Sequence, residues 1–374
     1  MNNERLSKVI DTMRLPLIFL VVIAHIAPFS YPLIKFSFSA NHVFVLVSEM
    51  FSHHIAKFSV RCYFLVSGFY FFNKYAGSLM EFYRKQFKSR LKTIVQPYII
   101  WNVLAILAVL SKNYLFQKLG GNTDNDYTNL FNGNFIKHFW LVPINFPLWY
   151  LRDLICMILI SPLIFYAIRY LKIYSLIAFG IFYFSCLDDP LPGFSSTALF
   201  FFSFGAYFSL EKKDLLQFFN KIKIPALLIT LIFLALSLKA SGSDIHEYYL
   251  RVFIMSGVIS VFNLFAFLND RFKSMNRLTG FSSLTFFIYV VHEIYIIEWI
   301  KGFFYNHHLF QTGWERFYAY LIIPFLCVLV CCALYYALMK VIPKIFVFSL
   351  GGRTPKFNKI NQPHVVETLH IKTD

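Results

Sequence analysis

Two ionisable side chains in the first apolar run of the sequence have types and a spacing that suit catalysis. They are Arg14 and His25, eleven residues apart. A helix turns about 100° and rises about 1.5 Å per residue, so both side chains fall on nearly the same face, roughly 16 Å apart. Asp11 lies three residues before Arg14 and can pair with it on that face. An anion-binding guanidinium and a proton-accepting imidazole would then line one groove.

Other ionisable residues lie inside later apolar runs, where each charge at a helix centre costs about 2.5–3.5 kcal/mol on insertion scales. Arg61 is near the start of the second helix, and Arg152 and Asp153 are at the outer end of the fourth. Helix direction puts these three roughly level with His25, in the outer half of the bilayer. His292 lies near the middle of the ninth run. We expect these residues to be functional because something must compensate their cost.

Each of these residues also has a purely structural interpretation. Arg14 alone is compatible with an anchor that reaches the membrane surface, and His25 alone with a hydrogen-bonded packing residue. Their position on one face, together with the other buried charges, favours a functional site. Glu293 points about 100° away from His292 and can simply face another helix, so a structural and a functional role both stay open for it.

Metal chemistry is not expected from the sequence. The adjacent pairs His53–His54 and His307–His308 cannot both face one metal ion from a helix. The six cysteines lie in apolar segments without metal-ligand spacing, which is typical of small core residues. Neither GxxxxGK[ST] nor GxSxG occurs.

The composition identifies the elements that position these residues as membrane helices. The 374 residues are 58% hydrophobic, 20% aromatic and 14% charged, with a mean hydropathy of +0.58. Soluble domains are about 25% charged, so a water-soluble fold is excluded. The net charge of +16 would suggest nucleic acid in a soluble protein, but Lys and Arg lie in short loops between apolar runs. They are better explained as topology signals, and no nucleic-acid partner is expected.

A spanning helix needs about 20 mostly apolar residues. We predict an all-α bundle of about ten transmembrane helices, at 9–30, 56–73, 91–110, 147–168, 170–187, 195–210, 223–239, 250–269, 279–300 and 317–343. Residues 41–55 are expected to be an amphipathic lead-in to the second helix. The membrane domain is predicted over 1–345, followed by a polar tail over 346–374 that we expect to be disordered. A cleaved signal peptide is not expected.

Basic residues set the predicted orientation. With a cytoplasmic N-terminus, the inside segments carry 23 Lys and Arg residues and the outside segments eight. This bias predicts cytoplasmic N- and C-termini and an even number of helices. The longest outer loop, 111–146, is the expected lid over an outward-facing site.

Five blocks of the sequence, in order, resemble the membrane-bound acyltransferase-3 family. They are IDTMRLPLIFLVVIAH, KFSVRCYFLVSGFYFF, KSRLKTIVQPYIIW, PLWYLRDLICMILISPLI and GFSSLTFFIYVVHEIYI, and the similarity spans about residues 9–300. The matched residues are Arg14, His25, Arg61, Phe64, Ser67, Gly68, Pro97, Trp149 and His292. Cys62–Tyr63 replaces the small residue and proline usual after the arginine. We expect no appended SGNH-type domain, so that the membrane domain or a separate protein would complete the transfer.

The resemblance implies transfer of an acyl group, often acetyl, from acyl-CoA to a hydroxyl of a glycan or lipid-linked glycan at the cell (inner) membrane. Acyl-CoA is then the expected donor, and the expected partners are this acceptor and membrane lipid. The phosphates of CoA need cations, and its pantetheine arm, roughly 15–20 Å long, would reach from Arg14 towards His25. We assign donor binding to Arg14, Asp11 and Ser67.

Each candidate catalytic residue has an expected role. His25 is the general base for the acceptor hydroxyl, and an acyl-His intermediate stays open. Arg61 or Arg152 would stabilise the oxyanion or orient the acceptor, and Asp153 would hold the arginine. His292 would share in proton transfer or orient His25.

A proton-coupled transporter is the alternative from another class, because buried charges also line transport pathways. The two halves of the sequence show no repeat. A transporter also gives no special reason for Arg14 and His25 to share a face. The enzyme is therefore the favoured interpretation.

Overall fold

The computed structural model describes residues 2–27, 32–119, 136–186, 191–307, 309 and 312–354, and all regular structure in these residues is helical. The α-helices are α1 (Asn2–Ala24), α2 (Ala40–Ser48), α3 (Lys57–Phe72), α4 (Leu79–Arg90), α5 (Gln96–Lys118), α6 (Trp149–Leu159), α7 (Ser161–Leu171), α8 (Ile173–Phe184), α9 (Ser196–Leu210), α10 (Leu215–Lys221), α11 (Lys223–Lys239), α12 (His246–Arg271), α13 (Ser282–Val291), α14 (Ile297–Asn306), α15 (Gly313–Val341) and α16 (Pro343–Ser349). The π-helical turns are η1 (Glu49–Ile55), η2 (Leu91–Val95), η4 (Lys137–Leu141) and η7 (His292–Ile296), and the 3₁₀ turns are η5 (Phe146–Leu148) and η6 (Lys273–Gly280). The predicted all-α class is confirmed.

Five helical stretches of the described chain are long and apolar enough to cross a membrane, and up to seven if each of two bent pairs counts as one span. The chain is therefore a multi-pass membrane protein. The five are Ala40–Phe72, Leu79–Lys118, His246–Arg271, Ser282–Asn306 and Gly313–Val341. The bent pairs are α6 with α7, at 58°, and α10 with α11, at 70°. All ten predicted apolar runs fall largely on helices, but the number of ten spans stays a prediction.

Two predicted segments differ in extent from the observed elements. Residues 41–55 are continuous with the second predicted span, because α2, η1 and α3 form one helical stretch. The tail predicted from residue 346 begins inside α16, and the chain is described as far as Thr354. Residues 355–374 and the middle of the predicted lid, 120–135, lie outside the described residues.

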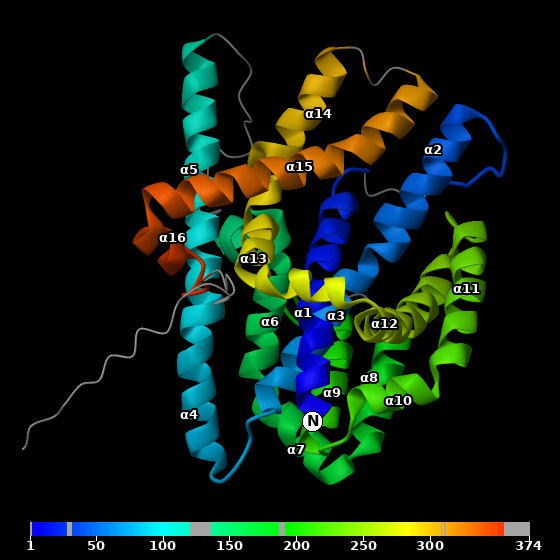
Figure 1. The fold of residues 1–374 in the computed structure, drawn as a ribbon, viewed down its shortest axis with the longest axis vertical. Coiled ribbons are helices and arrows are strands. Elements are labelled where there is room, and N and C mark those ends of the chain that lie inside the picture. Colours follow the sequence, from blue (N-terminus) through cyan, green and yellow to red (C-terminus); the bar gives the residue numbers. More distant parts are fainter. Residues whose placement is uncertain are drawn as a thin grey trace, which may run out of the picture.

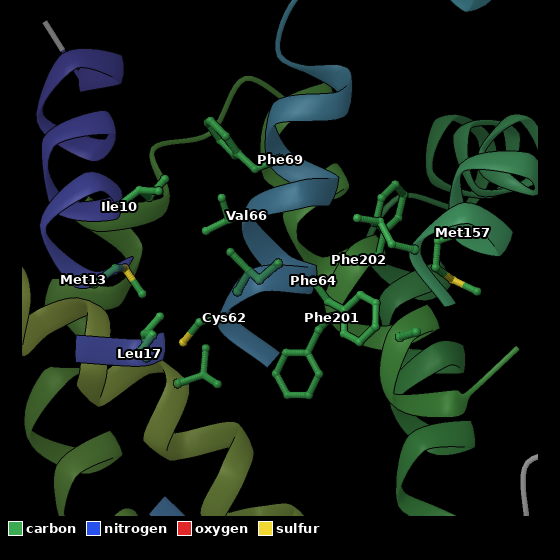
Figure 2. Close-up of a cluster of buried hydrophobic side chains, with 14 of the residues drawn as sticks. Ile10, Met13, Leu17, Cys62, Phe64, Val66, Phe69, Met157, Phe201 and Phe202 are labelled. Atoms are coloured by element: carbon green, nitrogen blue, oxygen red, sulfur yellow. The ribbon is translucent and has the colours of Figure 1, made fainter. Parts of the chain in front are cut away.

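The helix α1 lies in the middle of the molecule, between α4 and α5 on one side and α11 and α12 on the other (Figure 1). Its apolar face packs on α3, which packs in turn on α9. Figure 2 shows Met13 and Leu17 of α1 facing Cys62 of α3, with Phe202 of α9 beyond. These buried contacts fix the position of α1 inside the bundle.

Two glycines allow α3 and α9 to approach closely. A Cβ atom on Gly68 would lie 1.9 Å from the Phe202 carbonyl oxygen, and one on Gly205 would lie 1.9 Å from the Leu65 carbonyl oxygen. Small residues at such positions let helix backbones touch in membranes. Gly68, matched to the family pattern from sequence, is thus a packing residue.

Two helices of the bundle end or break inside it. The helix α1 ends at Ala24, and α13 gives way to η7, in which Ile294 and Tyr295 leave helical geometry. Tyr295 has a φ of 62°, which is uncommon for residues other than glycine. Freed carbonyls at both places accept hydrogen bonds from side chains. Asn145 Nδ2 donates to Val290 over 2.9 Å, and Ser52 Oγ donates to Ile23 over 2.7 Å. Irregular backbone at membrane depth requires such partners.

Candidate active site

The ends of α1 and α13 bring three ionisable side chains together. Nδ1 of His25 lies 2.8 Å from Oε1 of Glu293, and the rings of His25 and His292 are 5.2 Å apart between centroids. The side chain of His25 is 7% exposed and that of Glu293 is 25% exposed, whereas His292 is fully buried. An imidazole beside a carboxylate in a mostly dry site is the arrangement of an oriented general base.

The neighbours of the two imidazoles indicate which nitrogen carries the proton. His292 Nδ1 lies 2.9 Å from the Ile288 carbonyl, which can only accept, so this nitrogen donates. His25 Nδ1 likewise faces the Glu293 carboxylate. In the neutral forms the lone pair of each ring is then on Nε2, and Nε2 of His292 is buried without a hydrogen-bond partner in the described residues. In these tautomers Nε2 is the nitrogen of each ring that could accept a proton.

The C-terminal end of α1 is held by Lys301 of α14. Nζ of Lys301 donates to the His25 carbonyl over 3.0 Å and to Glu298 Oε1 over 2.9 Å. A cation at a helix C-terminus also stabilises the helix dipole. The Phe146 ring meets the His25 ring edge-on, with 5.8 Å between centroids. These contacts hold His25 in place beside Glu293.

A cavity of about 410 Å³ runs along α1 and is called the α1 pocket here. Arg14, Ile18 and Val21 line it from α1. His25 comes four residues after Val21, just past the end of α1 at Ala24, and is not among the residues that line the pocket. The rest of its polar lining is Tyr63, Ser67, Tyr70, Arg90, Tyr150, Ser282, Thr285, Tyr289 and Arg353. Along α1 the pocket thus extends from Arg14 to Val21, four residues before His25.

Three arginines line the α1 pocket, and no Asp or Glu is among its described lining residues. Arg14 pairs with Asp11 at 3.0 Å. Nε of Arg90 is buried without a hydrogen-bond partner in the described chain. Burial, together with the charges of Arg14 and Arg90, lowers the pKa of Arg353 to about 10. Such a concentration of guanidinium groups is suited to an anion with several phosphate oxygens.

Ser67, predicted to bind the donor, lies in this pocket, and its Oγ is 3.3 Å from the Tyr150 hydroxyl. Tyr63 also lines the pocket and donates from its hydroxyl to the Arg14 carbonyl over 3.0 Å. The α3 helix therefore forms one wall of the pocket opposite Tyr150. Tyr63 replaces the proline usual in the family pattern, and here it contacts α1.

Arg152 and Asp153, predicted to act beside His25, form an ion pair with each other. Nε and Nη2 of Arg152 donate to Asp153 Oδ1 over 3.0 and 2.8 Å. Its Nη1 donates to the carbonyls of Trp140 and Leu141 over 3.3 and 2.5 Å. Neither Arg152 nor Asp153 lines the α1 pocket. Their observed contacts tie α6 to η4.

Arg61 also lies outside the α1 pocket. It interacts with the charge of Lys57, one helical turn before it on α3, and with Tyr183 of α8. Its neighbours are thus on the side of α3 that faces α8 and α12. The catalytic role of Arg61 stays a prediction.

Comparison with known proteins decides the family. The model of the acyltransferase-3 family, described as an acyltransferase domain, matches residues 8–336. The chain belongs to the acyltransferase-3 family. The family predicted from the sequence is thereby confirmed. The chain is also 27% identical, over 331 residues, to the succinoglycan biosynthesis protein ExoH of Rhizobium meliloti (strain 1021), a match covering 82% of each protein. No solved structure matches the chain significantly.

Sequence reasoning left one residue of this acyltransferase-3 site open and missed three. Glu293, for which a structural and a functional role both stayed open, lies beside His25, just before the break in η7. Lys301 was counted only as a loop charge. Arg90 lies in one of the family-like blocks, KSRLKTIVQPYIIW, and its arginine was the available signal. For Arg353, the only sequence feature that could have pointed to the site was the basic character of the chain after the last predicted span.

Proposed function

We propose that this membrane acyltransferase moves an acyl group, expected to be acetyl, from cytoplasmic acyl-CoA to a hydroxyl of a glycan or related cell-envelope acceptor. The observation that carries the proposal is the α1 pocket. It extends from a cluster of three arginines to Val21, four residues before a histidine that lies beside a carboxylate. A donor whose phosphorylated end and reactive end are about one pantetheine length apart would fit the arginine cluster with the first and His25 with the second.

The proposed topology has ten spans with both termini in the cytoplasm, and it rests on the bias of 23 inside to eight outside basic residues. This topology puts the Arg14 end of α1 on the side where CoA is made. His25 then lies deeper, towards the outer half of the membrane. The cell (inner) membrane is the compartment that suits an envelope acceptor.

The donor is proposed to bind with its phosphates at the arginines. Arg14, held by Asp11, and Arg90 provide forked donors for phosphate oxygens. Ser67 lines the pocket beside them. The pantetheine arm, roughly 15–20 Å long, would follow Ile18 and Val21 along α1, where Arg14 and His25 are roughly 16 Å apart.

The proposed chemistry uses His25 as general base. As the acceptor oxygen attacks the thioester carbonyl, Nε2 of His25 takes the hydroxyl proton and a tetrahedral intermediate forms. The C–S bond then breaks, and the imidazolium returns the proton to the CoA thiolate. Glu293 holds the tautomer through Nδ1 and stabilises the imidazolium. His292, whose Nε2 is buried close by, is proposed to share in this proton transfer.

A polysaccharide or its lipid-linked precursor is the proposed acceptor. The similar Rhizobium meliloti protein is named for succinoglycan biosynthesis, which supports a glycan. A comparison of cell-surface glycans with and without the gene, by the mass of their acyl substituents, identifies the acceptor. Loss of an acyl mass increment on deletion is the expected result.

The enzymatic proposal is tested with purified protein and acetyl-CoA labelled in the acetyl group. In detergent there is no ion gradient, so a transporter would give no turnover. We expect time-dependent transfer to added glycan, or slow hydrolysis in its absence, and neither from His25→Ala. Absence of both reactions in the wild type, despite CoA binding, would contradict the proposal and favour transport.

A further inference from the structure

The chain after the last long helix folds back onto the start of α5. The segment 343–354, called the C-terminal clasp here, consists of α16 and the turn that follows it (Figure 1). Gln96 Nε2 donates to the Phe348 carbonyl over 2.6 Å, and Trp101 Nε1 donates to the Ser349 carbonyl over 3.1 Å. Two side chains of α5 thus hold the backbone of the clasp.

The turn of the clasp requires glycine. Gly351 and Gly352 have φ values of +68° and +81°, in the region that favours glycine. A Cβ atom on Gly351 would lie 2.7 Å from the Lys92 carbonyl oxygen. The turn is therefore pressed against η2, and its conformation sets where the next residue points.

That next residue is Arg353, which the turn delivers to the α1 pocket. Its Nη1 donates to the Leu350 carbonyl over 2.7 Å and its Nη2 donates to the Thr93 carbonyl over 2.9 Å. Its guanidinium carbon lies 3.9 Å from the centre of the Phe286 ring. A guanidinium has five N–H donors, so three remain for a ligand while the plane of the group is fixed.

The charge balance of the pocket calls for an anion. Arg14, Arg90 and Arg353 all line the pocket. Asp11 pairs with Arg14 and so balances the charge of one of these three arginines. The mutual effect of these guanidinium groups contributes to the lowered pKa of Arg353. Like charges held together at a partly dry site are stabilised when a multiply charged anion binds among them.

We propose that the C-terminal clasp completes the donor site and that Arg353 binds a phosphate group of the donor. This inference rests on the proposed acyl-CoA donor and adds a segment beyond the last span to its binding site. Arg353 is a donor-binding residue, and Gly351 and Gly352 position it. The clasp thereby makes the site selective for the phosphorylated end of the donor over the pantetheine arm alone.

The test measures CoA affinity by calorimetry, and kcat and KM for acetyl-CoA, in the full-length protein and three variants. Arg353→Gln should weaken CoA binding about 10- to 100-fold, the usual effect of losing a hydrogen bond to a charged group. It should raise KM while leaving kcat at saturating donor within about twofold. Arg353→Lys should keep part of the affinity. Lys344→Gln, which removes an exposed charge from α16, is the matched control and should bind CoA like the wild type.

Further arms separate ligand binding from folding. Gly351→Ala retains Arg353 but displaces the turn, and it should also weaken CoA binding. Inhibition by pantetheine, which has no phosphate, should be the same in wild type and Arg353→Gln. Unchanged CoA affinity in Arg353→Gln, or equal loss for pantetheine, would overturn the inference and leave the proposed function intact. A wild type that binds no CoA would contradict both.

Discussion

His25 Nδ1 lies 2.8 Å from Glu293 Oε1, so the end of α1 meets the break that follows α13. Glu293→Gln keeps the size of the side chain but removes the charge that stabilises an imidazolium. We expect kcat to fall about 10²- to 10³-fold, within the range of general acid–base effects, with CoA affinity unchanged. Glu81→Gln, on the exposed face of α4, is the matched control and should be fully active. A Glu293→Gln enzyme with normal kcat would remove this carboxylate from the mechanism.

The Glu293 contact shows why part of the site was not predictable from sequence. An ideal helix separates adjacent residues by about 100°, and on that basis Glu293 was expected to face away from His292. In the structure both His292 and Glu293 lie at the end of α1, and the helix breaks directly after them, at Ile294 and Tyr295. Sequence patterns specify a helical run, but such a break depends on partners from other elements, such as Asn145 on the Val290 carbonyl.

Sequence reasoning predicted a groove correctly where its residues belong to one regular helix. Arg14 and the face that continues through Ile18 and Val21 line one pocket, as the periodicity of α1 predicts. Arg61 and Arg152 were grouped with His25 by depth, and Arg61 also by its match to the family pattern. Depth gives no direction around a helix axis, and neither side chain lines the α1 pocket.

Arg152 is predicted to act on stability. Its removal in Arg152→Met leaves the Asp153 carboxylate, 2% exposed, without its cation, and breaking one partner of a buried pair costs about 3–5 kcal/mol. We expect a clear drop in the thermal midpoint in detergent, with CoA affinity of the folded fraction unchanged. Arg152→Met combined with Asp153→Leu should recover part of the loss. A stable Arg152→Met protein without turnover would instead return Arg152 to the catalytic residues.

The contact between α3 and α9 predicts a sharp difference between two glycines. Gly68→Ala would place a methyl group 1.9 Å from the Phe202 carbonyl, and overpacking costs about 1–3 kcal/mol or more. Gly180→Ala meets only the Phe200 ring, at 3.5 Å, and should be tolerated. The yield of monodisperse protein and its thermal midpoint measure both. Equal midpoints for the two variants would contradict the close approach of the backbones.

The proposed orientation is tested by single cysteines on a background without the six native ones. Cysteines placed in 80–90 or 212–222 should be shielded from an impermeant thiol reagent added to intact cells, and those in 120–134 should react. Permeabilised cells provide the control, in which the first group should also react. The reverse pattern would place the Arg14 end of α1 outside and remove the cytoplasmic route for CoA.

The central claim is that Arg14 binds the donor at one end of α1 and His25 catalyses the transfer at the other. Measuring donor affinity and turnover in the same variants tests it most directly. Arg14→Ala should chiefly weaken acyl-CoA binding, with Arg14→Lys restoring only part of it, because an ammonium lacks the planar fork. His25→Ala should abolish turnover with CoA affinity nearly intact, and His25→Gln should be nearly as inactive, because an amide cannot accept the proton. All four variants are compared in one detergent, by calorimetry and at saturating donor. An active His25→Ala enzyme, or unchanged donor affinity in Arg14→Ala, would contradict the account.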